Sequence, residues 1–344
     1  TQSRSSAASD VYKRQGFCLT FNIAFTQKSL DRISVKGNSF INEKNDTIVF
    51  RGYNTSDPDK LQKQNQWKKS YFKEIKKWGG NIVRFPVHPS AWTERGKENY
   101  LSLLDDGIKW ATELQMHVII DWHSIGNLKT QMYHHDRYDT TLKQTFDFWR
   151  TIAVKYGKNK TVAFYELFNE PTMYNNTLGT ISWLEWKEMN EEMITIIRAN
   201  GGEGIPLVAG FNWAYDLTPV KENPINAAGI GYVSHPYPQK REQPWEDKWT
   251  EDWGFVKQKY PVILTEIGFS HTEDEGSHQP VINDDDTYGD AITNYCDEKE
   301  ISYVIWVFDA QWAPKLFEDF ETYTPSRHGK YFKKKINSYN YNKK

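Results

Sequence analysis

Two glutamates, Glu170 and Glu266, each stand at the end of an apolar run of sequence. A charged side chain seldom ends such a run without a partner or a purpose, because desolvation of an unpaired charge is costly. Two carboxyl groups about 5–5.5 Å apart can cleave an acetal: one protonates the leaving oxygen while the other attacks the anomeric carbon. Their mutual repulsion keeps one protonated near neutral pH while its partner stays ionised. The pair therefore indicates glycoside cleavage; a structural ion pair with Arg84 is the alternative for either glutamate alone.

The elements that must position this pair form a regular alternation from about residue 47 onward. Short β-type runs alternate with amphipathic helical patterns, and several runs are almost continuously apolar, as in parallel strands covered on both faces. The eight runs cover residues 47–54, 81–87, 117–123, 162–170, 206–213, 230–237, 261–269 and 302–309. Eight strands with helical crossovers predict an α/β fold of the (β/α)8 TIM-barrel type. An open, doubly wound sheet is less favoured, because no glycine-rich phosphate loop follows the first run.

The chain is predicted to form one catalytic domain over residues 28–344, with a small hairpin around residues 40–49 closing the bottom of the barrel. Residues 1–15 resemble a translated sequencing adapter, and residues 16–27 resemble the end of a secretory signal. Residues 1–27 are therefore excluded from the domain, and the signal-like segment predicts a secreted or periplasmic protein.

Polar and aromatic side chains gather at the C-terminal ends of the same runs, where the reacting groups of such barrels lie. They are Arg84, His123, Asn169, Glu170, His235, Tyr237, Glu266 and Trp306. Four more tryptophans follow predicted strands in loops, where they could stack on sugars in outer subsites. We expect about half of them to stack and the rest to pack: Trp92, Trp213, Trp245 and Trp312.

Six motifs in order carry a family resemblance: NIVRFPVHP, VIIDWHS, ELFNEP, SHPYP, LTEIGF and VIWVFDAQW. Together they resemble glycoside hydrolase family 5, the cellulase family, from about Thr47 to Arg327. The resemblance implies that Glu170 is the acid/base and Glu266 the nucleophile. It also implies that Arg84 and Tyr237 hold the nucleophile. His123 and His235 would bind the sugar that is cleaved or tune the acid/base. Asn169 would hydrogen-bond the 2-hydroxyl of that sugar, and Trp306 would form the floor beneath it.

The resemblance further implies a retaining, endo-acting hydrolase of β-1,4-linked glucan, such as cellulose or mixed-linkage β-glucan. The same mechanism on mannan, glucomannan, xyloglucan or xylan is the alternative. A non-catalytic carbohydrate-binding barrel would keep the aromatic residues but lose a carboxylate. A barrel isomerase or metal-dependent hydrolase would need a phosphate loop or a histidine-rich first strand, and the run 47–54 has no histidine.

The amino-acid composition limits the kinds of partner that the protein is expected to bind. The formal net charge is −2 with 26% charged residues, so nothing suggests a nucleic acid or an anionic membrane as partner. Aromatic residues make up 15% of the chain, enough to provide both a ring-rich core and stacking platforms. The two cysteines show no metal-binding spacing, and four histidines stand in polar loops without one: His134, His135, His271 and His278. We predict a monomer with a polysaccharide substrate and with no metal and no cofactor.

Overall fold

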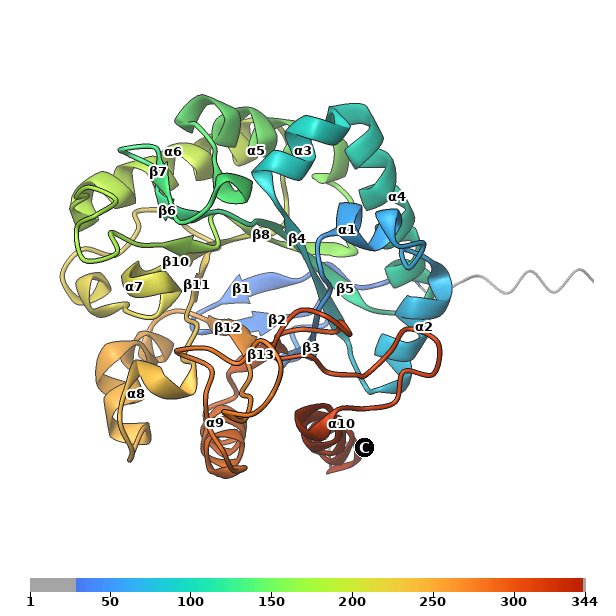
Figure 1. Cartoon of the computed structure of the whole chain (residues 1–344). Coiled ribbons are helices and arrows are strands. Elements are labelled where there is room, and N and C mark those ends of the chain that lie inside the picture. Colours follow the sequence, from blue (N-terminus) through green and yellow to red (C-terminus); the bar gives the residue numbers. More distant parts are fainter. Residues whose placement is uncertain (1–28, 343–344) are drawn as a thin grey trace, which may run out of the picture.

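The computed structural model describes residues 29–342, so the predictions made for residues 1–27 lie outside the described chain. Eight parallel strands close into a barrel with helices around it, as Figure 1 shows. Each of the eight predicted runs overlaps one barrel strand, which confirms the predicted fold. The strands are β3 (Arg51–Asn54), β4 (Ile82–Val87), β5 (His117–Trp122), β8 (Val162–Glu166), β10 (Ile205–Ala209), β11 (Gly231–Val233), β12 (Val262–Ile267) and β13 (Ser302–Ile305).

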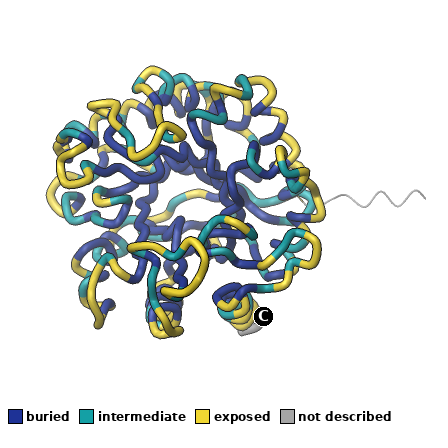
Figure 2. The backbone as a smooth tube through the Cα atoms, viewed as in Figure 1, coloured by how far each residue is buried: buried dark blue, intermediate teal, exposed yellow. Residues whose placement is uncertain are grey.

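Helices cover the outside of the barrel, and their apolar faces pack on strands that are buried along their whole length. Figure 2 shows the buried ring of strands inside a shell in which exposed residues alternate with buried ones. The helices are α1 (Pro58–Lys63), α2 (Lys69–Lys77), α3 (Pro89–Arg95), α4 (Lys97–Glu113), α5 (Leu142–Tyr156), α6 (Trp183–Ala199), α7 (Phe211–Ala214), α8 (Glu246–Asp252), α9 (Thr287–Glu298) and α10 (Arg327–Asn342). In residues 29–342 none of them combines the length and the apolar character that a membrane span requires.

The bottom of the barrel is covered by an antiparallel hairpin of β1 (Ser34–Lys36) and β2 (Ser39–Ile41). This hairpin begins earlier than predicted, because the chain reverses at Gly37, whose φ of 59° suits glycine. Residues 42–46, inside the predicted hairpin, form a second reversal, closed by a bridge between Ile41 and Thr47. Phe40 packs edge-on against Phe164 with ring centres 4.9 Å apart, so the hairpin fills the lower end of the barrel.

A small second sheet stands at the opposite end of the barrel, where the strands finish. Strand β6 (Ile125–Asn127) pairs with β7 (Met132–Tyr133) and, in parallel, with β9 (Glu170–Pro171). The backbone N–H of Glu170 donates to the carbonyl oxygen of Ser124 at 3.1 Å. The loop after β5 therefore holds the backbone of Glu170 in place.

Candidate active site

A cavity of about 890 Å³ opens at the C-terminal ends of the strands, and we call it the cleft. Six of the eight side chains predicted at strand ends line it: His123, Asn169, Glu170, Tyr237, Glu266 and Trp306. The other two, Arg84 and His235, are fully buried behind the lining and contact it through hydrogen bonds. The structure therefore brings the whole predicted set together.

The two carboxyl groups are close enough to act on one bond. One oxygen of Glu170, one of Glu266 and a ring nitrogen of His235 all lie within 4.8 Å of one another. Direct attack requires carboxyl groups about 5–5.5 Å apart, whereas activation of a water between them requires about 6.5–9.5 Å. The spacing fits a double displacement through a covalent glycosyl-enzyme.

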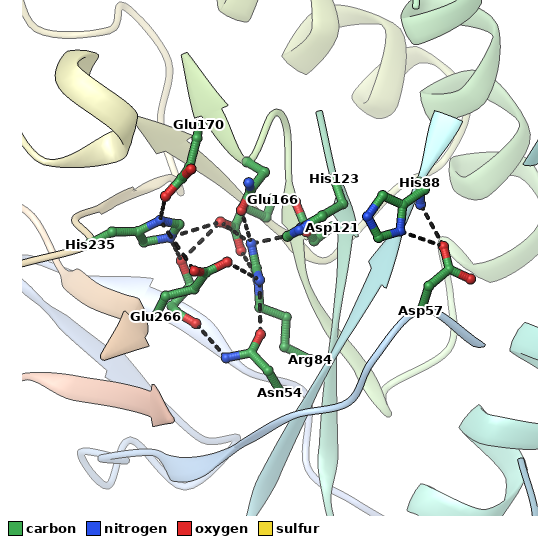
Figure 3. Close-up of polar contacts among 12 residues, drawn as sticks. Asn54, Asp57, Arg84, His88, Asp121, His123, Glu166, Glu170, His235 and Glu266 are labelled. Atoms are coloured by element: carbon green, nitrogen blue, oxygen red, sulfur yellow. Dashed lines mark hydrogen bonds and ion pairs between the residues drawn. The ribbon is translucent and has the colours of Figure 1, made fainter. Parts of the chain in front are cut away.

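Arg84 is the hub of the polar network below the cleft (Figure 3). Its guanidinium donates two hydrogen bonds to Glu166, from Nε to Oε2 at 2.7 Å and from Nη2 to Oε1 at 2.9 Å. Nη1 donates to Asn54 at 2.8 Å and to Glu266 at 3.0 Å, and Nη2 lies 2.9 Å from Asp121. A planar guanidinium with five donors suits such a multi-carboxylate site. The arginine thus provides the positive charge that the buried carboxylates require.

Glu266 is held by hydrogen bonds to both of its carboxyl oxygens. Arg84 donates to Oε1, and the hydroxyl of Tyr237 donates to Oε2 at 2.8 Å. Burial raises the pKa of Glu266, and the charge of Glu170 adds to the rise, while His235, Arg84 and Tyr237 oppose it. The two donors therefore favour the ionised form of a carboxylate that is buried close to a second one.

His235 connects the two carboxylates. Its Nδ1 lies 2.9 Å from Oε1 of Glu170, and its Nε2 lies 2.9 Å from the hydroxyl of Thr265. Burial disfavours the charged ring, but the carboxylates of Glu266, Glu166 and Glu170 outweigh it and raise the pKa of His235 to about 9. A protonated ring has no free lone pair, so this group of acids and imidazole fits an ion-pair network better than a metal site.

The remaining lining groups suit a sugar ring. Arg84 donates to Oδ1 of Asn169 at 2.7 Å, and Nδ2 of Asn169 is buried with no hydrogen-bond partner in residues 29–342. That amide is therefore available as a donor to a hydroxyl group in the cleft. The rings of Trp306 and His123 stack 5.4 Å apart at 7°, and Nδ1 of His123 pairs with Asp121 at 2.6 Å. Burial lowers the pKa of His123 well below its ordinary value, so this ring is neutral.

Of the four tryptophans predicted in loops, two line the cleft and two pack in the core. Trp213 and Trp312 line the cleft. Trp92 and Trp245 do not: Trp92 packs edge-on against Phe148 at 4.9 Å, and Trp245 stacks on Trp249 at 5.9 Å. Trp92 belongs to α3 and Trp245 caps the N-terminus of α8, so both rings turn into the core and not toward the cleft. Trp92 and Trp245 are therefore the two that pack and do not serve as outer subsites, within the expectation that about half of the four would pack.

Trp213 stands on an unusual turn. Asn212, Trp213 and Ala214 all have φ between 57° and 58°, a left-handed conformation that is costly for three successive residues other than glycine. Nζ of Lys240 donates to the carbonyl of Asn212 at 2.9 Å and lies 4.6 Å from the centre of the Trp213 ring. Burial lowers the pKa of Lys240 to about 8. Lys240 therefore braces the turn that presents Trp213 to the cleft.

Several functional positions were missed from the sequence. Glu166 and Lys240 have been described above, and His88 and Tyr138 also line the cleft. Glu166 could have been found, because it is a charged residue inside an apolar run, four positions before Glu170. Lys240 gave no such signal, since its contact depends on a turn that sequence patterns do not reveal. Two of the histidines in polar loops, His134 and His278, also line the cleft.

A closed (β/α)8 barrel with two carboxylates at its C-terminal end, close enough for direct attack, defines the class of retaining glycoside hydrolases. The model of the family "Cellulase (glycosyl hydrolase family 5)" matches residues 41–311. The chain belongs to glycosyl hydrolase family 5.

Curated relatives include endoglucanase A of Butyrivibrio fibrisolvens, 28% identical over 206 residues, which are 58% of this chain and 43% of that protein. An endoglucanase of Clostridium saccharobutylicum is 26% identical over 235 residues, 67% of this chain and 46% of that protein. The chain thus spans less than half the length of these relatives.

Among solved structures, a β-glucanase of Saccharophagus degradans is 47% identical with a TM-score of 0.89, and the match covers 91% of this chain and 94% of that one. A second structure of that enzyme holds cellotetraose, with the same coverage and similarity. The catalytic domain of a Thermobifida fusca endoglucanase, 20% identical with a TM-score of 0.71 over 89% of this chain and 97% of that one, shares the fold.

Proposed function

We propose that this protein is a retaining, endo-acting β-1,4-glucanase that cleaves its substrate by double displacement. The observation that carries the proposal is the pair Glu170 and Glu266, with oxygens less than 4.8 Å apart in the cleft. The family and the endoglucanase relatives support the same activity.

The contacts of the two glutamates support different roles. Glu266 accepts hydrogen bonds from Arg84 and Tyr237 on separate oxygens, as a carboxylate that must attack while ionised requires. Only one oxygen of Glu170 contacts a side chain of this network, Nδ1 of His235. The charge of that ring can respond when Glu170 gives up and regains its proton. In the first step Glu266 bonds to the anomeric carbon while Glu170 protonates the leaving oxygen. In the second step Glu170 takes a proton from water, which displaces Glu266.

The glucan substrate is supported by the β-glucanase of S. degradans, which was solved with cellotetraose and shares 47% of its residues with this chain. Trp213 and Trp312 add flat apolar surfaces at two parts of the cleft, suited to the faces of pyranose rings. Mannan, glucomannan, xyloglucan and xylan remain the alternatives for the same catalytic pair. Because a polysaccharide cannot enter a cell, this substrate agrees with the proposed secreted or periplasmic location. The monomeric state stays a prediction.

The test is release of reducing sugar from carboxymethylcellulose, barley β-glucan, xyloglucan, glucomannan, galactomannan and xylan. We expect activity on the β-glucans, and a loss of roughly two to four orders of magnitude in Glu170→Gln, as for removal of a general acid/base. Glu266→Gln should lose still more, because it removes the nucleophile. Activity on mannan or xylan alone would overturn the substrate, and well-folded but inactive wild-type protein would overturn the enzyme. Asn226→Gln, an exposed change outside the cleft, is the control.

A further inference from the structure

His88 is a buried histidine in the wall of the cleft that the catalytic scheme above does not use. It follows the last residue of β4 directly and precedes α3, and its side chain is 7% exposed. It lines the same cavity as Glu170 and Glu266. Its place in the wall makes it able to contact a bound sugar chain.

Asp57 holds His88 by two hydrogen bonds to the same carboxyl oxygen. The backbone N–H of His88 donates to Oδ2 at 2.9 Å, and Nδ1 lies 2.8 Å from that oxygen. The other oxygen accepts from the hydroxyl of Tyr100 at 2.9 Å and from the N–H of Asp59 at 2.6 Å. A carboxylate that accepts all four bonds requires the proton of the imidazole to sit on Nδ1. With one proton on the ring, held at Nδ1, Nε2 is an acceptor.

The ring is also fixed by its aromatic neighbours. Tyr138 stacks on it at 5.6 Å and 26°, and His123 meets it edge-on at 4.8 Å. Trp312 meets it edge-on at 5.6 Å. In residues 29–342 no hydrogen bond is made to Nε2. The wall of the cleft therefore holds an oriented ring nitrogen with no protein partner among these residues.

The position of His88 relative to the two catalytic carboxylates indicates which part of the substrate His88 contacts. Glu170 protonates the departing oxygen, so the leaving part of the chain lies on its side. Figure 3 shows Glu170 and His235 on one side of Arg84, and His88 with Asp57 on the other, beyond His123. Trp312, which contacts His88, in turn stacks on Trp306 at 6.0 Å. His88 thus lies next to the groups around the sugar that is attacked, on the side away from the leaving group.

On the basis of the proposed function, we propose that His88 is a specificity-determining residue of this cleft. Through Nε2 it accepts a hydrogen bond from an equatorial hydroxyl of the sugar that precedes the cleaved one, on the non-reducing side. Asp57 is the positioning residue that keeps Nε2 in the acceptor form and turned to the cleft. The two rings of a β-1,4-linked disaccharide are then bound by separate groups, the second by His88.

The first experiment compares two activated substrates, 2,4-dinitrophenyl β-glucoside and 2,4-dinitrophenyl β-cellobioside. Only the disaccharide places a sugar beside His88. We expect His88→Ala to lower kcat/KM for the cellobioside about tenfold, which is one ordinary hydrogen bond, and to leave the glucoside within about twofold. His117→Ala is the matched control, a buried histidine at the start of β5 whose Nε2 contacts the carbonyl of Asp31. Equal losses on both substrates, or none, would overturn the proposal.

Cellobiosides with single hydroxyls removed from the outer ring identify the hydroxyl group. Wild-type enzyme should lose about tenfold with one of these analogues, and His88→Ala should be indifferent to that same change. Losses that simply add for every analogue would contradict direct contact. His88→Gln keeps a polar end at this position, so it should recover part of the lost kcat/KM while preserving the volume of the side chain.

Asp57→Asn tests the positioning role with a readout that a merely structural residue would not move. In the wild type, ¹⁵N-labelled histidine should show a downfield Nδ1–H resonance from His88, absent in His88→Ala and shifted in Asp57→Asn. The kcat/KM for the cellobioside should fall in Asp57→Asn, and the double variant should be no worse than His88→Ala alone. Additive losses would reduce Asp57 to its role as the cap of α1. Wild-type protein without activity on any glycoside would instead refute the proposed function.

Discussion

The barrel buries an arginine at each end, and the two ends use it differently. Arg84, near the C-terminal ends of the strands, contacts three carboxylates that are themselves buried: Asp121, Glu166 and Glu266. Arg51, at the start of β3, lies between the rings of Tyr303 and Tyr339 at 4.1 and 4.4 Å and donates to two backbone carbonyls. Its carboxylate partner, Asp297, is 41% exposed.

This difference distinguishes the candidate active site at the upper end of the barrel from the structural role of the lower end. At the lower end, charge is satisfied by π faces, carbonyls and one half-exposed acid, and the barrel interior is filled by apolar rings such as Phe40, Phe50 and Phe164. At the upper end, charges are crowded into a space from which water is excluded, so the pKa values of His235 and Glu266 are shifted. Such crowding costs stability and is retained where chemistry needs it.

The largest effect that separates the ends is expected from Arg84→Lys. A lysine cannot grip Glu166 with two nitrogens and still reach Asn54 and Glu266, so kcat should fall by roughly two to three orders of magnitude. The matched variant Arg51→Lys should lower the melting temperature but leave kcat near the wild-type value. Steady-state kinetics and thermal unfolding of both variants check this. Comparable losses of kcat would mean that the two ends are not functionally distinct.

Phe50→Ala should show the reverse pattern. Its ring meets Phe164 at 5.3 Å and His117 at 5.5 Å, so truncation leaves a cavity in the lower core. The free energy of unfolding should fall by about 3–5 kcal/mol, while kcat below the melting transition stays within about twofold. Urea unfolding together with assays at low temperature provides the measurement. A large loss of kcat in still-folded protein would show that the lower core controls the geometry of the cleft.

The same contrast explains what could be predicted from the sequence. The eight strands and the pair Glu170 and Glu266 were found because burial on both faces gives continuous apolar runs, and a charge that ends one is conspicuous. His88 and Asp57 were missed because their contact joins two loops 31 residues apart. Which two of the four loop tryptophans pack could not be predicted, because a ring in a loop and a ring at a helix start have the same sequence signature.

Tyr237→Phe tests the electrostatics of the upper end alone. The lost hydroxyl stabilises ionised Glu266, so its removal raises the pKa of Glu266 further. Glu266 then becomes protonated at a higher pH, and the acidic limb of kcat/KM should move upward by about one pH unit, with activity retained above it. Tyr260→Phe, outside the cleft, should leave the profile unchanged. A shift to lower pH would contradict the assignment of Glu266 as the group that must be ionised.

Lys240→Met is expected to have the smallest effect of these variants. It removes the hydrogen bond to the carbonyl of Asn212 and the cation–π contact with Trp213, so the left-handed turn should become less ordered. If Trp213 stacks on the substrate as proposed, KM for a long glucan should rise about two- to tenfold with little change in kcat, because stacking contributes to binding and not to the chemical step. Lys221 makes the same two kinds of contact outside the cleft, with the carbonyl of Glu251 and the ring of Phe255. Lys221→Met should therefore leave KM unchanged. If both lysines altered KM equally, bracing by such contacts would be a general property of the loops and not a feature of the cleft wall.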